Sequence, residues 1–398
     1  MKKILLIILD GMADVGKKTP LMLANKPNID WLASHSECGL WKPSVPKNYS
    51  LANFSEIGTL ELLGCFQCPG RGYLEALGIG LKIDKKAVYF RTNFATVKKI
   101  AKRRKNSKKL PSNFSYDIID RRAGRDEKGL DELAKAINRI KIDGTDIKFY
   151  RSSGHRGVLV LKSKNPDFSH NISDADIGKS IVYTKPLDKD SKRIADVLNE
   201  FMDKVYDVLS KHPINRKRKI AANFLLIRGA GHYLKPRLFK KTFGSKGAII
   251  SDTRIIDGIG RFWDMDVYHV KGADGGYDSN IVGQVDKAIH LLNNYEFVLL
   301  HVKGTDIASH DKNPRKKKDI IEKIDKEIAK IIKLKHINII LTADHITSSK
   351  TGMHENGNVP FLLYNPDKHI YYQRKFSENN CRDFITKNPM KLLMENMK

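Results

Sequence analysis

Ile337-Asn-Ile-Ile-Leu341-Thr-Ala-Asp344-His345 is the stretch that decides the fold class of this chain. Its first five residues form a short apolar run, which predicts a buried strand. An aspartate and a histidine follow directly where that strand would end. Functional sites of open α/β sheets lie at the carboxyl ends of strands, and Asp and His are ligands of divalent metals. Alone, the stretch fits equally well a capped turn with a structural Asp.

The same arrangement of strand and acid occurs twice more. The apolar run 4–9 ends at Asp10, and the run 297–302 is followed by Asp306 and His310. Asp306 and His310 are four residues apart, so they share a face if that segment is helical. Strands alternate with helical patterns along this part of the chain, which predicts an α/β fold. We expect a mostly parallel sheet with helices on both faces.

Length and composition describe an ordinary globular protein. The 398 residues suffice for one large domain and a second one, and 41% of them are hydrophobic. No apolar run is long enough to span a bilayer, and the first one stops at Asp10-Gly11 without a cleavage site. We therefore expect a cytoplasmic protein that does not associate with membranes. Of the four cysteines, Cys65 and Cys68 form a lone CxxC, and reduced thiols are favoured over a zinc or redox site.

The net charge of +27 raises the question of nucleic-acid binding. Lysine is spread along the whole chain, and no zinc finger, RRM pattern or bZIP heptad is present. The charge is better explained by a lysine-rich surface or by attraction of an anionic substrate. Nucleic acid is therefore not expected as the main partner, and the sequence predicts no oligomeric state.

The pattern of predicted strands and helices changes between residues 75 and 215. Residues 75–215 combine β-like runs at 87–97 and 147–162 with an amphipathic helical pattern at 190–210. We predict an inserted α+β domain there, and a core domain formed by residues 1–74 and 216–398. The apolar run 223–227 is expected in the core sheet.

Several residues are candidates for phosphoryl chemistry. Ser55 precedes a helical pattern, where backbone N–H groups favour a phosphate, although a simple N-cap is the more frequent role. His354 follows Asp344 and His345 within a loop and completes the set of Asp and His candidates. Six or seven ligands suit two metal ions rather than one, and two metals can support phosphoryl transfer to a serine. The insert adds arginines that could bind an anion or form a solvated charged loop. The cationic and acidic candidates are Asp120, Arg121, Arg122, Arg125, His155 and Arg156, with Arg228, Arg261 and Lys303 as weaker ones.

A chain-wide set of motifs resembles a known family, the archaeal-type cofactor-independent phosphoglycerate mutases of the alkaline phosphatase superfamily. The motifs occur in the family's order from the first strand nearly to the C-terminus. They are Leu9-Asp10-Gly11, Lys18-Thr19-Pro20-Leu21, Lys26-Pro27-Asn28-Ile29-Asp30, Ser55-Glu56, Gly70-Arg71-Gly72 with Glu75 and Gly78, Asp120 to Arg125, Gly154-His155-Arg156, Gly258-Ile-Gly-Arg261, Thr305-Asp306 with His310, and Asp344-His345 with His354.

The resemblance implies an alkaline phosphatase-like core with an inserted lid, and interconversion of 3-phosphoglycerate and 2-phosphoglycerate through a phosphoserine. It implies two divalent metals, with Mn²⁺ preferred over Mg²⁺, Zn²⁺ or Co²⁺, and no 2,3-bisphosphoglycerate. Ser55 would be the nucleophile. The implied ligands are Asp306, His310 and His354 for one metal, and Asp10, Ser55, Asp344 and His345 for the other. The implied substrate-binding residues are Asp120, Arg121, Arg122, Arg125, His155, Arg156, Arg261 and Lys303.

Three positions around the nucleophile depart from the family pattern. Phe54, Glu56 and Thr59 stand where the family usually has Gly, often Asp, and His. Ser50 and Thr59 are therefore alternative nucleophiles. A metal-dependent phosphatase or phosphomutase acting on another phosphorylated metabolite is an alternative function. An RNA-associated protein built on an inactive enzyme fold is a third, and the intact ligand set argues against it.

Overall fold

The protein is described by a computed structural model, which covers residues 3–44, 54–100, 116–163, 168–178, 180–386 and 388–391. Ser50 and most of the basic run 98–109 lie outside these residues. The chain forms two compact units. The first contains Met1–Cys68 and Pro236–Lys398, and the second contains Pro69–Lys235.

The first unit is built on an eight-stranded sheet with the order β11-β10-β12-β1-β13-β16-β2-β17. Five of the seven neighbouring strand pairs are parallel, and only β16 runs antiparallel to its two neighbours. The predicted mostly parallel sheet is therefore confirmed. The strands are β1 (Lys3–Leu9), β2 (Ser36–Trp41), β10 (Gly247–Ile250), β11 (Asp266–Tyr268), β12 (Phe297–Val302), β13 (Ile337–Thr342), β16 (Val359–Tyr364) and β17 (Ile385–Thr386).

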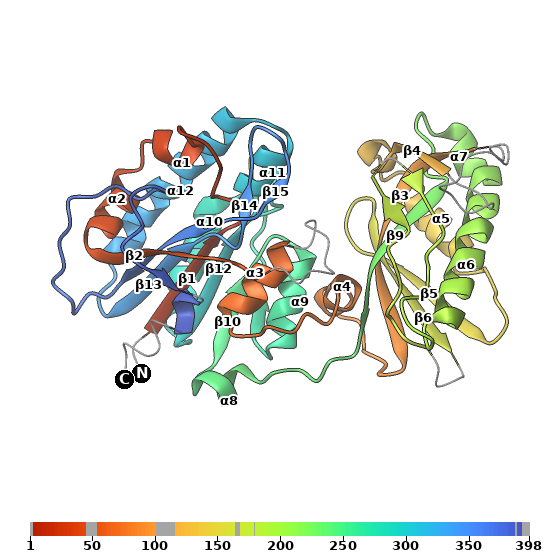
Figure 1. Cartoon of the computed structure of the whole chain (residues 1–398), viewed down its shortest axis with the longest axis horizontal. Coiled ribbons are helices and arrows are strands. Elements are labelled where there is room, and N and C mark those ends of the chain that lie inside the picture. The colour runs from red at the N-terminus through yellow and green to blue at the C-terminus, as the bar shows by residue number, and fades with distance from the viewer. Residues whose placement is uncertain are drawn as a thin grey trace. The chain divides into compact units, whose positions relative to one another are not determined.

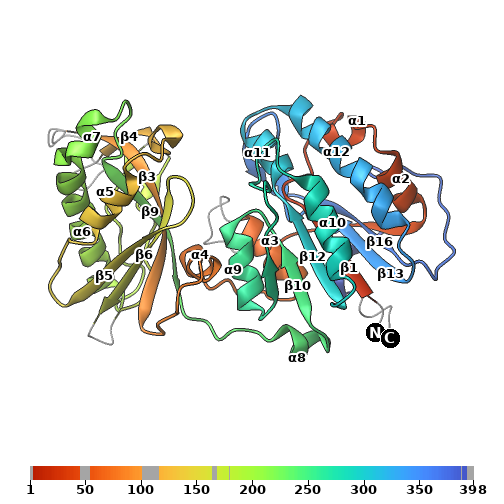
Figure 2. The same cartoon turned by 180° about the vertical axis from the view of Figure 1, so that it is seen from behind.

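Helices cover both faces of this sheet, as predicted (Figures 1 and 2). On one face α12 packs against α1, α2 and α10, while α3 and α9 pack against each other on the opposite face. Because helices cover both faces, β12 and β13 are buried along their whole length. The helices are α1 (Pro20–Leu23), α2 (Pro27–Ser34), α3 (Phe54–Leu62), α8 (Phe239–Phe243), α9 (Arg254–Phe262), α10 (Ile281–Leu291), α11 (Gly304–His310) and α12 (Pro314–Ile332). A short ribbon of β14 (Ile346–Thr347) and β15 (His354–Glu355) follows β13.

The second unit is an α+β structure. Its sheet has the order β5-β6-β3-β4-β8-β7, with β9 paired to β3. The strands are β3 (Ala87–Lys99), β4 (Tyr116–Asp120), β5 (Thr145–Arg151), β6 (Arg156–Ser163), β7 (Asp176–Ile177), β8 (Ser180–Ile181) and β9 (Phe224–His232). The helices are α4 (Arg71–Gly78), η2 (Ala123–Arg125), α5 (Leu130–Ile137), α6 (Lys192–Lys211) and α7 (Pro213–Lys217). The predicted amphipathic helix corresponds to α6.

The boundaries of this unit differ from the predicted insert, 75–215. The run 223–227 lies in β9, which pairs antiparallel with β3 instead of joining the core sheet. The second unit therefore continues to Lys235, and it begins at Pro69 because α4 packs on β3 and β9. Gly72 permits this packing, since a Cβ there would lie 2.3 Å from the carbonyl oxygen of Tyr89. An apolar run alone does not indicate which of two sheets a strand joins.

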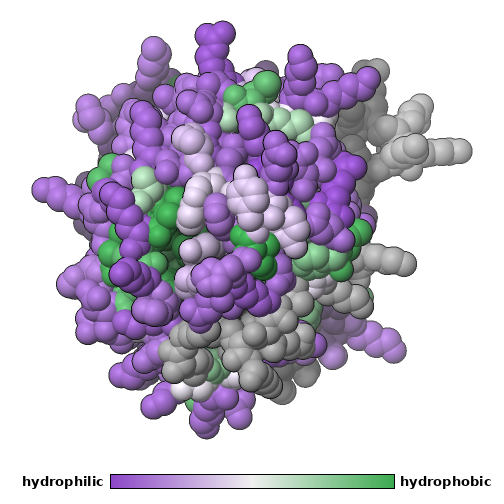
Figure 3. All heavy atoms as spheres, turned by 90° about the vertical axis from the view of Figure 1, so that its left-hand side faces the viewer, coloured by the Kyte–Doolittle hydropathy of each residue, from purple (hydrophilic) through white to green (hydrophobic). Residues whose placement is uncertain are grey.

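Figure 3 shows one side of the first unit, on which hydrophilic residues dominate and hydrophobic ones form small separate groups. Among the helices that the structure describes, none has the length and apolar character needed to cross a bilayer.

Candidate functional site

The carboxyl ends of three parallel strands bring the predicted acids together. Leu9 is in register with Val302, and Ile8 with Thr342, so β1, β12 and β13 end at the same edge of the sheet. Asp10 follows β1 directly, Asp306 lies in the first turn of α11 after β12, and Asp344 follows β13. All three carboxylates are buried.

One group of possible metal ligands consists of Asp10, Asp344 and His345. The imidazole Nε2 of His345 lies 3.2 Å from Oδ1 of Asp10 and 3.7 Å from Oδ1 of Asp344. The same Asp344 oxygen accepts a hydrogen bond from the backbone N–H of Gly11 at 3.1 Å. Its Oδ2 is buried and has no hydrogen-bond partner among the described residues. A buried carboxylate oxygen without a donor is well suited to a cation.

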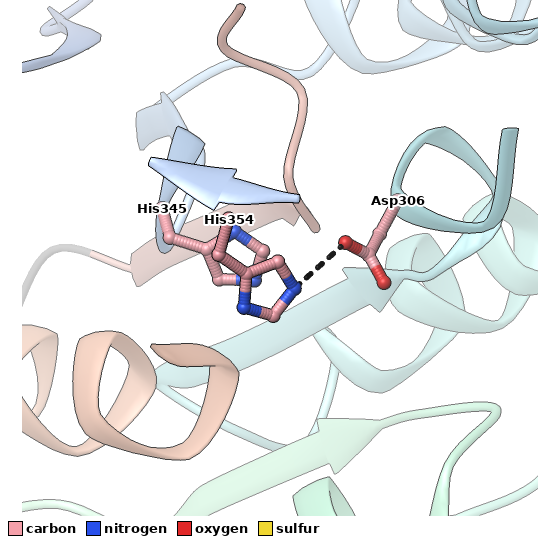
Figure 4. A group of neighbouring side chains, drawn as sticks. All are labelled: Asp306, His345 and His354. Carbon is pink, nitrogen blue, oxygen red and sulfur yellow. Dashed lines mark ion pairs between the residues drawn. The ribbon is translucent and has the colours of Figure 1, made fainter. Parts of the chain in front are cut away.

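A second group consists of Asp306, His345 and His354 (Figure 4). Nε2 of His354 lies 3.5 Å from Oδ1 of Asp306, and the rings of His345 and His354 are 4.3 Å apart between centroids. His310 adjoins this group, with Nε2 at 3.4 Å from Asp306 Oδ2 and 3.1 Å from His354 Nε2. The hydroxyl of Thr347 donates to Asp306 Oδ1 at 2.8 Å and lies 3.0 Å from Nδ1 of His345, so it orients both side chains. His345 thus contributes to both groups.

Lys303 lies between the two groups. Its ammonium nitrogen is 2.7 Å from Oδ2 of Asp10 and 2.6 Å from Oδ2 of Asp306. Burial alone would raise the pKa of both carboxyls, but the charge of Lys303 and hydrogen bonds from the neighbouring histidines together outweigh it and hold each pKa well below its usual range. The acids are therefore ionised at neutral pH and available as ligands.

Ser55 is the second residue of α3 and is buried. Its Oγ lies 2.9 Å from Nε2 of His345 and donates to Oδ1 of Asp10 at 3.4 Å. The serine hydroxyl therefore adjoins the first ligand group. It lies in the first turn of the nine-residue helix α3, where backbone N–H groups have no partner within the helix.

The structure shows the surroundings of Phe54 and Thr59, two of the three residues near Ser55 that depart from the family pattern. The Phe54 ring is 5.9 Å from the ring of His345 and 5.8 Å from that of His354, so it forms an apolar wall beside both imidazoles. Thr59 is buried, and its hydroxyl makes no hydrogen bond with the described residues. Its role as an alternative nucleophile stays a prediction.

Two residues beside this site, the buried His301 and the half-buried Asp252, were not among the sequence candidates. His301 in β12 has Nε2 3.3 Å from Asp10 Oδ2 and 3.9 Å from Asp344 Oδ2. Burial lowers its pKa, but the two carboxylates outweigh burial and raise the pKa to about 10. Asp252 follows β10 and accepts the backbone N–H of Lys303 at 3.2 Å. A histidine inside the otherwise apolar run 297–302 was the available signal for His301.

The second unit contains a cluster of arginines. Arg91 in β3 is buried, and burial lowers its pKa well below the usual range, with a further decrease from Arg71 and an opposing effect of Glu75. The Nε atoms of Arg71 and Arg91 lie 3.5 Å and 3.3 Å from the same Glu75 carboxylate oxygen. The residues whose charges act on one another here are Arg71, Glu75, Arg91, Arg121, Arg122, Arg125, His155, Arg156, Asp176 and Arg228.

Five of the predicted substrate residues belong to this arginine cluster: Arg121, Arg122, Arg125, His155 and Arg156. Arg121 pairs with Asp176, whereas Arg122 and Arg125 are exposed. Asp120 accepts the backbone N–H of Arg122 at 2.7 Å, a local turn contact. Arg71 and Arg91 were not among the sequence candidates, although an arginine in the apolar run of β3 was a usable signal.

The turn that carries Arg122 and Arg125 is unusual. Ala123, Gly124 and Arg125 have positive φ angles of 46°, 71° and 56°. Such backbone is costly for residues other than glycine and concentrates at functional sites. The Arg218 guanidinium holds the turn by donating to the carbonyl oxygens of Ala123 at 3.0 Å and Asp126 at 2.8 Å.

Arg261 is not part of the arginine cluster, because it belongs to helix α9. It occupies the last turn of α9 in the first unit, and its side chain is exposed. Its predicted role in substrate binding therefore stays a prediction.

Comparisons with known proteins point to one family. A family profile described as 2,3-bisphosphoglycerate-independent phosphoglycerate mutase matches residues 33–215. A Pyrococcus furiosus protein of that name is 36% identical over 395 residues, which cover 96% of this chain and 92% of the relative. A solved Thermoplasma acidophilum structure, described as a cofactor-independent phosphoglycerate mutase, has a TM-score of 0.61 and 30% identity and covers 100% of both chains. A solved Pyrococcus horikoshii protein has a TM-score of 0.79 and 30% identity, covering 100% of this chain and 97% of that one.

Proposed function

This chain belongs to the family of 2,3-bisphosphoglycerate-independent phosphoglycerate mutases, and we propose that it interconverts 3-phosphoglycerate and 2-phosphoglycerate through a phosphoserine at Ser55. The observation that carries the serine assignment is the position of its Oγ, 2.9 Å from His345 and 3.4 Å from Asp10. Both neighbours belong to one group of possible metal ligands.

The ligand set fits two divalent cations. Asp10, Ser55, Asp344 and His345 would hold one of them, and Asp306, His310 and His354 the other. Mixed carboxylate and imidazole ligands suit Mn²⁺, our preferred metal, and also Zn²⁺ or Co²⁺, while Mg²⁺ prefers oxygen alone. Bound metals supply positive charge that lowers the pKa of a serine hydroxyl and stabilises the oxygens of a transferring phosphoryl group.

The residues of the chain account for the remaining parts of the reaction. Ser55 accepts the phosphoryl group from one hydroxyl of the substrate, glycerate reorients, and Ser55 returns the group to the other hydroxyl. The first backbone N–H groups of α3 favour the phosphoryl charge on Ser55. The ammonium of Lys303, which has two carboxylate neighbours, adds a positive charge at the same site.

The arginine cluster of the second unit would bind the acid and phosphate groups of phosphoglycerate. Planar guanidinium groups bind carboxylate and phosphate through paired hydrogen bonds. A mutase must also exclude water, because a solvated phosphoserine would hydrolyse and release phosphate. We therefore assign the second unit the role of a lid that holds glycerate during the transfer.

The decisive experiment is a coupled assay of 2-phosphoglycerate formation from 3-phosphoglycerate with Mn²⁺ and without 2,3-bisphosphoglycerate. We expect activity in the wild type, its loss with a chelator, and a decrease of at least about 10³-fold in Ser55→Ala, because a covalent step disappears. Thr59→Val is the control, since it removes a buried hydroxyl of the same helix, and it should retain activity. Full activity of Ser55→Ala together with an inactive Thr59→Val would contradict the assignment.

The same assay separates the alternative function. Release of free phosphate that requires Ser55 would indicate a phosphatase. Absence of any reaction with phosphoglycerate, together with Ser55-dependent turnover of another phosphorylated metabolite, would indicate a phosphomutase or phosphatase with a different substrate.

A further inference from the structure

The hydroxyl of Thr347 connects the two groups of possible metal ligands. Thr347 lies in β14, two residues after His345, and is fully buried. Its Oγ1 lies 2.8 Å from Oδ1 of Asp306, which belongs to the second group, and 3.0 Å from Nδ1 of His345, which belongs to both. Both distances are those of ordinary hydrogen bonds. One side-chain oxygen therefore contacts ligands of both groups.

The number of protons on these three side chains fixes the direction of both hydrogen bonds. An ionised carboxylate can only accept, so Thr347 donates its single hydroxyl proton to Asp306. The hydroxyl oxygen must then accept from His345, so Nδ1 of this histidine carries a proton. The lone pair that can bind a cation is therefore that of Nε2, and Nε2 is the nitrogen that faces Ser55 and Asp10.

Contacts from several segments hold Thr347 in this position. Its backbone N–H donates to the carbonyl oxygen of Ala13 at 3.1 Å, and its own carbonyl oxygen accepts from the ammonium of Lys317 at 2.8 Å. In the ribbon of β14 and β15 it is in register with His354. Gly11 leaves space for the hydroxyl, because a Cβ there would lie 2.4 Å from Oγ1 of Thr347. The fold thus directs this hydroxyl at the ligand groups.

We propose that Thr347 is a positioning residue, whose hydroxyl holds Asp306 and the Nδ1–H form of His345 so that both ligand groups bind divalent cations tightly. This inference rests on the proposed function, because it assumes that both groups bind metals. A hydrogen bond from the second ring nitrogen orients a histidine ligand and increases its basicity. Since His345 contributes to both groups, loss of the hydroxyl should weaken the binding of both cations.

The test is a calorimetric titration of the metal-free, full-length protein with Mn²⁺ at pH 7, without substrate. The wild type should bind two Mn²⁺ per chain. Thr347→Val keeps the shape of the side chain without its hydroxyl, and it should bind both ions about 10- to 100-fold more weakly. Thr347→Ser restores a hydroxyl and should recover most of the affinity. An affinity of Thr347→Val equal to that of the wild type would overturn the proposal.

Thr342→Val is the matched control. Thr342 is a buried threonine of β13, and its hydroxyl accepts from Nε1 of Trp41 at 2.9 Å and donates to the carbonyl oxygen of Pro360 at 3.1 Å. Its loss should lower the melting temperature and leave the affinity for Mn²⁺ unchanged. Equal losses of affinity in Thr342→Val and Thr347→Val would make the role of Thr347 purely structural and overturn the proposal. A wild type that binds no Mn²⁺ would instead contradict the metal pair of the proposed function.

A second measurement uses the wild type and does not depend on the folding of a variant. The protein is labelled with ¹⁵N-histidine and saturated with Zn²⁺, which is diamagnetic, and long-range ¹H–¹⁵N correlations are recorded by NMR. The signals of His345 are identified by their absence in His345→Gln. We expect a proton on Nδ1 of His345 and none on Nε2. A proton on Nε2 and none on Nδ1 would overturn the proposal.

Discussion

Substitution of a buried lysine behind the site is expected to destabilise the first unit strongly. Lys317 in α12 has no exposed surface. Its ammonium group donates to Asp14 Oδ2 at 3.0 Å and to the carbonyl oxygens of Ala13 at 3.2 Å and Thr347 at 2.8 Å. It therefore joins the loop after Asp10 to the strand after His345.

The magnitude for Lys317→Met follows from these three contacts. Loss of one partner of a buried ion pair costs about 3–5 kcal/mol of the free energy of unfolding. Asp14 keeps hydrogen bonds from the backbone of Val15 at 2.8 Å and Ser349 at 3.0 Å, which places the electrostatic cost near the lower end. Two carbonyl groups lose a donor, each adding up to about 1 kcal/mol. We expect a total of about 4 kcal/mol.

The assay is equilibrium unfolding of the metal-free protein in guanidinium chloride. Lys318→Met is the matched control, because this neighbouring lysine is partly exposed and pairs with Glu322 at 2.9 Å. Its loss should cost below about 0.5 kcal/mol. In a double-mutant cycle with Asp14→Asn, the coupling energy should be about 2 kcal/mol. A cost below about 1 kcal/mol for Lys317→Met, or additive effects in the cycle, would refute the reasoning.

Two further predictions concern the second unit. Arg156→Gln should lower kcat/KM for 3-phosphoglycerate by about 10- to 100-fold, because one charge-assisted hydrogen bond to an anion is lost. Arg139→Gln is the control, and it should leave kcat/KM unchanged because Arg139 is an exposed arginine outside the arginine cluster. Equal kinetics in the two variants would exclude Arg156 from substrate binding. Burial and then the nearby arginines lower the pKa of His155 to about 3, so between pH 6.5 and 3 the unfolded chain binds the additional proton. The stability contributed by neutral His155 is therefore present above pH 6.5 and lost as the pH falls, and the urea midpoint of the wild type should fall more than that of His155→Gln between pH 7 and about 4.5. Parallel decreases in both proteins would count against this explanation.

The strands of the parallel sheet and the acids at their ends could be predicted from the sequence, because hydrophobic runs and residue spacing are local features of the chain. The runs 4–9, 297–302 and 337–341 are apolar except for His301 and Asn338, as expected of strands covered on both faces, and all three lie in the mostly parallel sheet. The acids that follow them lie at one edge because parallel strands end on the same side. The spacing of Asp306 and His310 by four residues likewise places both on one face of α11.

Other features depend on which distant segments become neighbours. The apolar run of β9 fits either sheet, and only pairing with β3 decides its place in the second unit. Lys303 was a weak candidate in the sequence, yet it lies between Asp10 and Asp306 because β1 and β12 are adjacent.

The sequence by itself therefore determined the α/β class, the family and the acids at the strand ends, since each is written in local periodicity or in motif order. The tertiary structure alone decided the sharing of His345 by two ligand groups and the arginine cluster around Glu75. These contacts join residues that are far apart along the chain. Their distances are set by strand order and register, which no local pattern specifies.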